Sequence, residues 1–379
     1  MPGEFEPHAG SWMLWPERPD TWRYGAKPAQ HAFVEVARAV RRFEPLTVGV
    51  NEDQYENAVH MLPQEVRVVE LSSDDAWMRD VGPTFVVNDE TSEVRGVDWK
   101  FNAWGGLTKG LYFPWNLDDQ VARKVCDLEY KGRYRLDGIV MENGAVHADG
   151  EGTVITTEEC MLSPGRNPDL SKEELTELLM SYLGADKVVW LEKGIFLDDT
   201  AGHVDNMCCF VRPGVVLLAW TDDTSDPQYE ICSRNLEILE SETDAAGRSF
   251  EIVKMPLPTP MYRNQEEADG LDVIYGSMPR PAGGRLAASY VNFYPLNGGV
   301  IVPQFGDPMD ERAVEILKEC YPEREVVPVY SREILLGGGN IHCITLQQPA
   351  PPIKPLPVPE EETEDEQSVD EIADSAKDA

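Results

Sequence analysis

A cysteine follows a glycine-rich turn near the end of the sequence. Cys343 comes directly after the stretch GGGNIH, which begins at Gly337. Glycine adopts backbone conformations that a residue with a Cβ resists, so such a turn can direct a reactive group into a cleft. A thiolate is a strong nucleophile, which makes Cys343 a candidate for covalent catalysis. The alternative is a buried free thiol, the common state of cysteine in an intracellular protein.

Four further polar residues stand at turns that precede strand-like segments. They are Asp80, Glu142, His203 and Asp205. A thiol and an imidazole are the minimal pair for nucleophilic catalysis, because the thiolate attacks and the imidazole moves protons. Carboxylates around a thiol suppress thiolate formation unless the ligand is a cation that offsets them. A guanidinium fits best, since it is planar, stays charged and offers forked donors that match carboxylate oxygens.

These polar residues also have ordinary structural explanations. Asp80 could pair with Arg79 or cap a turn, and Glu142 could end a strand beside glycine. We interpret His147 and His342 as structural residues near their turns, because no zinc-type spacing accompanies them. The glycine run lacks the features of a dinucleotide or phosphate loop. The sequence therefore predicts no metal and no organic cofactor.

A short recurring pattern indicates how the turns are positioned. It consists of a small residue, any residue, Val or Ile, and then a polar residue. Its four copies begin at Gly144, Gly202, Ser289 and Gly339, roughly fifty to ninety residues apart. The stretch DAWMRDVGPTFVV from Asp75 supplies a fifth polar turn that enters a strand. Five such α/β units would close into a ring and bring their turns together near one axis.

Strands and helices alternate between these turns. Glycine-opened segments rich in β-branched residues predict strands, and apolar residues at helical spacing predict helices. The strands begin at Gly152, Gly214 and Gly299, and the helices cover 28–43, 171–183 and 310–320. The second helix opens with Ser171 and Glu174, which form a capping-box pattern.

Composition narrows the class of protein. The 379-residue sequence is 42% hydrophobic and carries a formal charge of −35. That charge argues against a nucleic-acid surface and favours a small cationic partner. We read no secretion signal and no membrane span, and seven cysteines without a CxxC pair favour a reducing, cytoplasmic location.

A change of composition near Gln348 marks a boundary. We predict one catalytic domain over residues 1–348 and a tail over residues 349–379. The tail begins with prolines, and within 360–379 it carries ten acids against Lys377. Such a segment has too little apolar surface to fold, so we expect it to be disordered.

Several long motifs resemble those of the agmatine deiminases, most of all the plant-type enzymes, in the peptidyl-arginine deiminase-like part of the guanidine-modifying superfamily. They are PHAGSWMLWPERPD, DAWMRDVGPTFVV, DWKFNAWGG, HADGEGTVITTEECMLSPGRNP, GHVDNMCCF, ASYVNFY and GGGNIHCITLQQP. The resemblance implies a five-bladed, pseudo-symmetric α/β propeller of ββαβ-type modules. It implies hydrolysis of agmatine to N-carbamoylputrescine and ammonia, a step of putrescine and polyamine biosynthesis. It implies an enzyme that needs no cofactor and binds neither nucleic acid nor membranes, and it is compatible with a homo-oligomer such as a dimer.

The same resemblance implies a role for each matching position. Cys343 would be the nucleophile and would form a covalent thiouronium intermediate. His203 would be the acid and base, with Glu142 as its carboxylate partner. Asp80 and Asp205 would clamp the guanidinium.

Two further positions complete the comparison with that family. Trp77 would flank the substrate. Relatives usually read Glu-Gly-Gly where this sequence reads Glu142-Asn143-Gly144. Asparagine is the residue that best replaces glycine at positive φ, so we expect the turn to survive with Glu142 in place.

Three rival functions share part of this constellation. Arginine deiminases need a cationic residue near the pocket mouth to hold the α-carboxylate, and the sequence alone does not identify one. Amidinotransferases share the first half-reaction but pass the group to an amine instead of water. A non-catalytic propeller that binds a ligand would not require Cys343, His203 and both clamp acids together.

Overall fold

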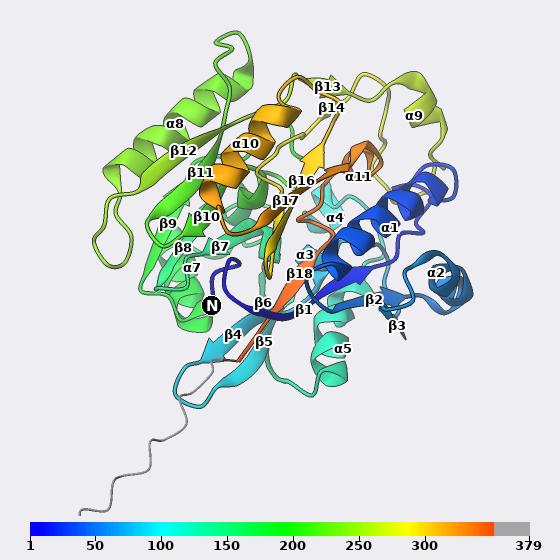
Figure 1. The fold of residues 1–379 in the computed structure, drawn as a ribbon, viewed down its shortest axis with the longest axis horizontal. Coiled ribbons are helices and arrows are strands. Elements are labelled where there is room, and N and C mark those ends of the chain that lie inside the picture. Colours follow the sequence, from blue (N-terminus) through cyan, green and yellow to red (C-terminus); the bar gives the residue numbers. More distant parts are fainter. Residues whose placement is uncertain (352–379) are drawn as a thin grey trace, which may run out of the picture.

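The computed structural model describes residues 1–351, which form a mixed α/β structure (Figure 1). Five of its sheets share one succession of elements. A short strand runs antiparallel to a second strand, which continues through a helix into a parallel third strand. The five ββαβ units are β4 (Thr84–Asn88), β5 (Glu93–Lys100), α5 (Val121–Leu128), β6 (Gly132–Val140); β7 (Val146–Ala148), β8 (Thr153–Thr157), α7 (Lys172–Leu183), β9 (Lys187–Leu191); β10 (Cys208–Arg212), β11 (Val215–Trp220), α8 (Pro227–Ser241), β12 (Glu251–Pro256); β15 (Tyr294–Leu296), β16 (Gly299–Gln304), α10 (Asp310–Cys320), β17 (Glu325–Tyr330); and β18 (Leu346–Pro349), β1 (His8–Leu14), α1 (Lys27–Arg41), β2 (Leu46–Val50).

The fifth unit joins the two ends of the described chain. Strand β18 pairs antiparallel with β1, with Leu346 opposite Trp12. Figure 1 shows this orange strand beside the dark blue one. The N–H of Ala350 donates to Pro7 O at 2.9 Å, so backbone pairing reaches slightly past the predicted boundary at Gln348. The predicted tail from residue 352 onward lies outside the described residues.

Shorter elements connect the units. After β2, helix α2 (Tyr55–Met61) leads to β3 (Arg67–Glu70), which adds a fourth strand to that sheet, parallel to β2. The remaining elements are α3 (Met78–Val81), α4 (Gly106–Lys109), α6 (Glu158–Met161), α9 (Gln265–Asp269) and α11 (Arg332–Leu336), the 3₁₀ turns η1 (Glu52–Gln54), η2 (Asp118–Gln120), η3 (Asn143–Ala145) and η4 (Val204–Asn206), and the strand pair β13 (Met261–Tyr262) and β14 (Arg285–Leu286).

The predicted helices and strands are confirmed. Helix α1 buries Phe33 and Val40 on one face, as the apolar spacing requires. At the start of α7, Ser171 and Glu174 make both bonds of the capping box. The three predicted strands correspond to β8, β11 and β16.

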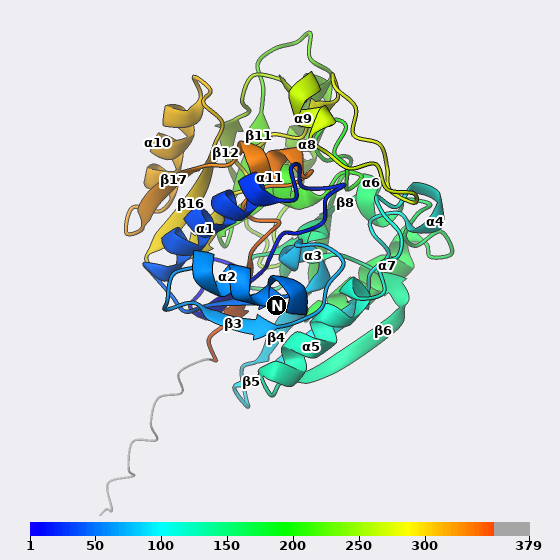
Figure 2. The same ribbon diagram turned by 90° about the vertical axis from the view of Figure 1, so that its right-hand side faces the viewer.

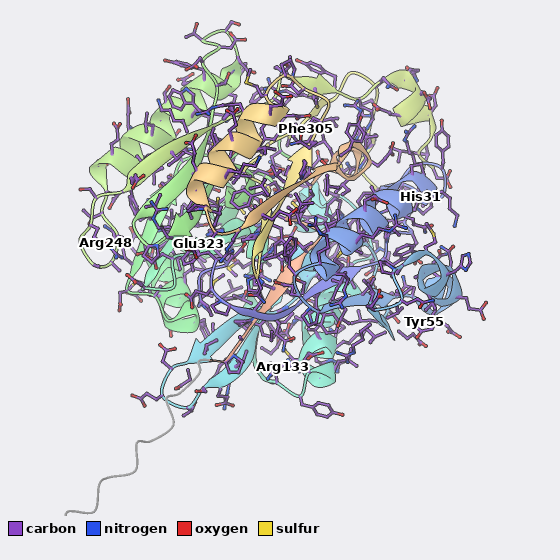
Figure 3. All side chains as sticks on the ribbon, viewed as in Figure 1. His31, Tyr55, Arg133, Arg248, Phe305 and Glu323 are labelled. Carbon is purple, nitrogen blue, oxygen red and sulfur yellow. The ribbon has the colours of Figure 1, made fainter. Side chains whose placement is uncertain are left out.

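The helices of the units lie outside their strands. Figures 1 and 2 show α1, α8 and α10 toward the exterior, and Figure 3 shows the labelled Tyr55 and Arg248 at the outer rim. The apolar residues between sheets and helices are buried in three clusters, the largest of which contains Trp12 and Cys343. Within residues 1–351, no helix is both long enough and apolar enough to cross a membrane.

Candidate active site

Each unit begins with a turn that carries a polar side chain, and these turns meet. Asp80 lies in α3 before β4, Glu142 lies just before η3 and β7, and Asp205 lies in η4 before β10. Asn292 precedes β15 and Cys343 precedes β18. The convergence that the recurring pattern predicted is therefore observed.

Gly144 shows how tightly the turns approach one another. A Cβ at this position would lie 2.6 Å from His203 Nδ1, 2.8 Å from Asp80 Oδ1 and 3.0 Å from Asp205 Oδ2. Any side chain here would displace these three groups. Glycine is required at Gly144 because polar side chains from two other turns close around its backbone.

Gly339 has the same function beside the thiol. Its Cβ would lie 2.9 Å from Cys343 Sγ and 2.6 Å from the ring of Trp77. The preceding Gly338 has a φ of 108°, a conformation that residues with a Cβ rarely adopt. The glycine run thus lets the backbone pass between Trp77 and Cys343.

Cys343 is buried and surrounded by anions. Its Sγ lies 3.6 Å from Asp205 Oδ2 and accepts a hydrogen bond from Asn292 Nδ2 at 3.2 Å. Burial raises the pKa of the Cys343 thiol well above its usual range, and the charges of Asp205 and Asp80 raise it further. Without a cationic ligand the sulfur therefore carries its proton.

His203 is fully buried between two carboxylates. Its Nε2 lies 3.4 Å from Glu142 Oε2, and its Nδ1 lies 3.8 Å from Asp80 Oδ1. Burial acts to lower the pKa of His203, but Asp80, Cys160 and Glu142 outweigh it and hold this pKa well above its ordinary value. Nδ1 has no hydrogen-bond partner among the described residues, so it is available to a substrate.

Glu142 is held by an arginine that the sequence reading did not identify. Arg166 Nε donates to Glu142 Oε2 at 2.9 Å, and Arg166 Nη2 donates to Thr200 O at 2.6 Å. Burial acts to raise the pKa of Glu142, but Arg166 and His203 lower it on balance. Arg166 lies within the motif HADGEGTVITTEECMLSPGRNP, but the motif does not show that its side chain contacts Glu142.

The turn at Asn143 survives for a reason other than the predicted one. Asn143 lies in the 3₁₀ turn η3 and is not among the residues with positive φ. Its side chain accepts a hydrogen bond from Thr84 Oγ1 and donates to Gly82 O at 3.1 Å. Asparagine therefore ties the Glu142 turn to the β4 unit.

Asp80 and Asp205 are both buried, but their electrostatic states differ. Asp80 accepts from Gly144 N at 3.2 Å and from Trp104 Nε1 at 2.9 Å. Burial raises the pKa of Asp80, and despite the His203 cation it stands at about 6. Burial also acts to raise the pKa of Asp205, but His342, bonded to its Oδ2 at 2.9 Å, brings it below its ordinary value. Asp205 Oδ1 has no hydrogen-bond partner among the described residues.

Trp77 is packed beside the thiol. It stacks on Trp22 with ring centroids 5.0 Å apart, and its Nε1 donates to Asp75 Oδ2 at 3.0 Å. Together with the short approach across Gly339, these contacts hold one edge of the indole next to Cys343. This position is compatible with the predicted substrate contact.

Two buried groups in residues 1–351 place metal-ligating side chains together: Glu4 with His147 and His342, and Glu142 with Cys160 and His203. His147 Nδ1 accepts from Phe210 N at 3.3 Å, so its Nε2 carries the proton. Both nitrogens of His342 contact carboxylates. In the second group, Glu142 is committed to Arg166. The contacts suit ion pairs better than metal ligation.

The arrangement combines a nucleophile, an acid and base, and two carboxylates. Asp205 Oδ1 and His203 Nδ1 are buried polar atoms without partners among the described residues, and a desolvated polar atom is costly unless a ligand satisfies it. Cys343 Sγ lies 3.6 Å from the other carboxylate oxygen of Asp205, Oδ2. A planar cation with several N–H donors suits the acceptor Asp205 Oδ1, and its carbon would be open to attack by sulfur, whereas the His203 cation can donate a proton from Nδ1 to a departing nitrogen.

Comparisons with known proteins agree with this chemistry. Residues 1–349 match the family described as Porphyromonas-type peptidyl-arginine deiminase. A protein of Listeria monocytogenes serotype 4b (strain F2365) is 61% identical over 349 residues, which are 92% of this chain and 96% of the relative. The agmatine deiminase of Pseudomonas aeruginosa (strain UCBPP-PA14) is 59% identical over 352 residues, 93% of this chain and 95% of the relative. The structure of the Enterococcus faecalis agmatine deiminase superposes with a TM-score of 0.90 at 48% identity, covering 93% of this chain and 96% of that one.

Proposed function

The chain belongs to the Porphyromonas-type peptidyl-arginine deiminase family, and we propose that it hydrolyses agmatine with Cys343 as the nucleophile. One observation carries the assignment of residues. Cys343, Asp80 and the pair His203 and Asp205 come from three separate turns of the chain, yet they meet in one buried cluster in which two polar atoms lack partners. A cationic guanidinium would satisfy that cluster, since it supplies both charge and hydrogen-bond donors.

Substrate binding would change the charge of the nucleophile. The guanidinium enters between Asp80 and Asp205, and its N–H groups donate to the carboxylates, including Asp205 Oδ1. Trp77 flanks its plane. The added positive charge offsets the two acids that raise the pKa of Cys343, so the thiol releases its proton to solvent when the substrate is in place.

The first half-reaction releases ammonia. The Cys343 thiolate forms a C–S bond to the central guanidinium carbon, giving a tetrahedral adduct. His203, held as a cation by Asp80 and Glu142, donates a proton to one amino nitrogen. The C–N bond then breaks, ammonia leaves, and a thiouronium remains on the sulfur.

The second half-reaction consumes water. His203, now neutral, takes a proton from a water molecule that attacks the same carbon. Collapse of the second tetrahedral adduct breaks the C–S bond and regenerates the sulfur of Cys343. The product carries a urea group in place of the guanidinium and is N-carbamoylputrescine, an intermediate on the way to putrescine and the polyamines. Every step uses side chains and water, so we propose no cofactor.

We also propose that the five ββαβ units surround a pseudo-fivefold axis as a propeller. The meeting of five turns and the pairing of β18 with β1 support this arrangement. Two predictions about the wider context stay predictions: a cytoplasmic location without a nucleic-acid or membrane partner, and a homo-oligomer. The division into a catalytic domain and a tail is likewise a proposal.

The rival assignment as an arginine deiminase depends on cations near the glycine turn, and the structure contains them. A Cβ on Gly338 would lie 2.8 Å from Asp199 Oδ2 and 3.2 Å from Arg280 Nη1. Arg280 Nη1 donates to Asp199 Oδ2 at 3.0 Å, and Arg263 Nη2 donates to Leu336 O at 2.7 Å. We propose that Asp199 pairs with Arg280 and thereby weakens the attraction of this cation for the α-carboxylate of arginine.

Ammonia release tests the proposal. Wild-type protein and Cys343→Ala would each be incubated with agmatine and with arginine, without an amine acceptor. We expect the wild type to prefer agmatine by at least about a hundredfold in kcat/KM, because a buried unpaired carboxylate costs roughly 3 kcal/mol. Cys343→Ala should be inactive while it remains folded. Comparable values for the two substrates would refute the assignment of substrate, and activity in Cys343→Ala would refute the assignment of nucleophile. Release that requires an added amine would indicate an amidinotransferase.

A further inference from the structure

Each clamp carboxylate ends a row of four buried charged side chains. One row, the Glu142 network, consists of Arg166, Glu142, His203 and Asp80. The other, the Glu4 network, consists of Arg79, Glu4, His342 and Asp205. Both follow the order arginine, glutamate, histidine and aspartate, so positive and negative charges alternate.

The Glu4 network is closely bonded and almost free of solvent. Glu4 is 2% exposed, and its Oε1 accepts from Arg79 Nη1 at 2.8 Å. Its Oε2 accepts from His342 Nε2 at 2.8 Å, and His342 Nδ1 donates to Asp205 Oδ2 at 2.9 Å. Glu4 precedes β1, far in sequence from the residues it joins. The network thus connects the start of the chain to the predicted guanidinium clamp.

The two histidines differ in the atoms left free. A carboxylate only accepts hydrogen bonds, so both nitrogens of His342 must carry protons and the ring is an imidazolium. No ring nitrogen of His342 remains available to a substrate. His203, in contrast, keeps Nδ1 unpaired. His342 is therefore suited to holding a carboxylate in place, whereas His203 is suited to transferring protons.

We propose that Glu4 is a positioning residue that acts through His342 to keep Asp205 ionised and oriented. Because Oδ2 of Asp205 is held by the His342 cation, Oδ1 stays directed away from that bond and free for a substrate N–H. The proposal rests on the guanidinium clamp proposed above and adds what prepares that clamp before the substrate arrives. Preorganised groups of this kind lower the cost of binding.

The charges around His342 agree with this role. Burial and the neighbouring Arg79 act to lower the pKa of His342, but Glu4 and Asp205 raise it above its ordinary value on balance. The ring of His147, whose centroid lies 6.3 Å away, stacks on it. His147 Nδ1 accepts from Phe210 N, and its Nε2 lies 3.6 Å from Glu4 Oε2. Glu4 and Asp205 are therefore the groups that keep His342 charged.

Glu4→Gln tests the link, because it removes the charge at nearly constant shape. Glu6→Gln is the matched control, since Glu6 lies in the same segment and its side chain accepts a hydrogen bond from the nearby Gly3 N at 2.9 Å. Loss of a hydrogen bond to a charged group weakens binding by roughly ten- to hundredfold. We expect Glu4→Gln to raise KM for agmatine by that factor and to change kcat less, while Glu6→Gln resembles the wild type.

Two further measurements separate positioning from simple stability. Active-site titration would count the folded sites. If Glu4 has a purely structural role, Glu4→Gln should lower that count and leave the KM of the remaining folded sites unchanged. His342→Gln, whose amide can donate to Asp205 without a charge, should raise KM by a similar factor. An unchanged KM in folded Glu4→Gln overturns the inference, and so does failure of both variants to fold. If the wild type itself does not hydrolyse agmatine, the proposed function fails first.

Discussion

Ionisation of the buried Asp80 destabilises the folded protein, and replacement of Asp80 by asparagine measures the size of this effect. Burial raises the pKa of Asp80, and with repulsion from Asp205 and Glu142 the pKa stands at about 6, against an ordinary value of 3.8. A raised pKa in the folded state means that ionisation of Asp80 destabilises the fold. Its contribution is harmless below the unfolded pKa and becomes unfavourable as pH rises through the folded pKa. Asp80→Asn should therefore remove a penalty that grows with pH.

The size of this penalty follows from the two pKa values. Each pKa unit corresponds to about 1.4 kcal/mol, so above pH 7 the ionised Asp80 destabilises the fold by about 3 kcal/mol. At pH 5 the same relation gives roughly 1.6 kcal/mol. Asparagine cannot accept from both Gly144 N and Trp104 Nε1, and that loss of about 1 kcal/mol does not depend on pH. The advantage of Asp80→Asn over the wild type should grow by about 1.4 kcal/mol from pH 5 to pH 8.

Urea unfolding followed by tryptophan fluorescence at pH 5 and pH 8 provides the measurement. Groups that titrate alike in both proteins cancel in the difference between them. His203 does not, because Asp80 raises its pKa, so the His203 pKa is measured in both proteins and its contribution is subtracted. Asp53→Asn, at an exposed position in η1, is the control and should show no such trend. In parallel, kcat/KM for agmatine should fall by at least about a hundredfold in Asp80→Asn, because half of the clamp loses its charge. A stability difference that stays constant between the two pH values would refute this account of Asp80.

Three other outcomes are expected. The kcat of His203→Gln should fall below about 1% of the wild-type value, because general acid and base catalysis contributes a factor of roughly 10²–10⁴. Mass spectrometry after incubation with agmatine would show which step is lost: a trapped adduct on Cys343 indicates loss of the second step, and no adduct indicates loss of the first. Asp199→Asn should raise kcat/KM for arginine relative to agmatine by roughly tenfold, since it frees Arg280 for a carboxylate; an unchanged ratio of the two specificity constants would contradict the role of Asp199. Removal of residues 352–379 should leave kcat/KM for agmatine and the thermal midpoint within error, because every site contact described above lies within residues 1–351; a lower midpoint would show that the tail stabilises the fold.

The recurring turn pattern made much of the site predictable from the sequence. The polar residues of its copies do not all take one structural position, because His147 lies inside β7, whereas Asp205, Asn292 and His342 precede β10, β15 and β18. The pattern even contained Asn292, the donor to Cys343, which was noted in the pattern but not assigned to the site. Asn292 could have been found by treating the third copy like the other turns.

The supporting residues could not be predicted in the same way. Glu4 contacts the site from a segment that has no fixed place in the ββαβ unit. Arg166 and Trp104 stand within the motifs HADGEGTVITTEECMLSPGRNP and DWKFNAWGG, which do not show what these two side chains contact. A single glutamate near the start of a chain carries no periodicity, and the sequence does not reveal that it lies buried beside His342. Such partners depend on the tertiary arrangement, which one sequence pattern does not encode.

The charges of the two networks together explain why Cys343 should remain a neutral thiol until a cationic substrate binds. Their fully ionised form holds four negative and four positive side chains, so with a neutral thiol the eight groups balance: Arg79, Arg166, His203 and His342 against Glu4, Glu142, Asp80 and Asp205. A thiolate alone would add an unbalanced buried charge, which is costly in a medium of low polarity. A guanidinium that arrives as the thiol loses its proton restores the balance, so binding of substrate and activation of Cys343 favour each other. A neutral ligand of the same shape provides no such compensation and should leave the sulfur protonated.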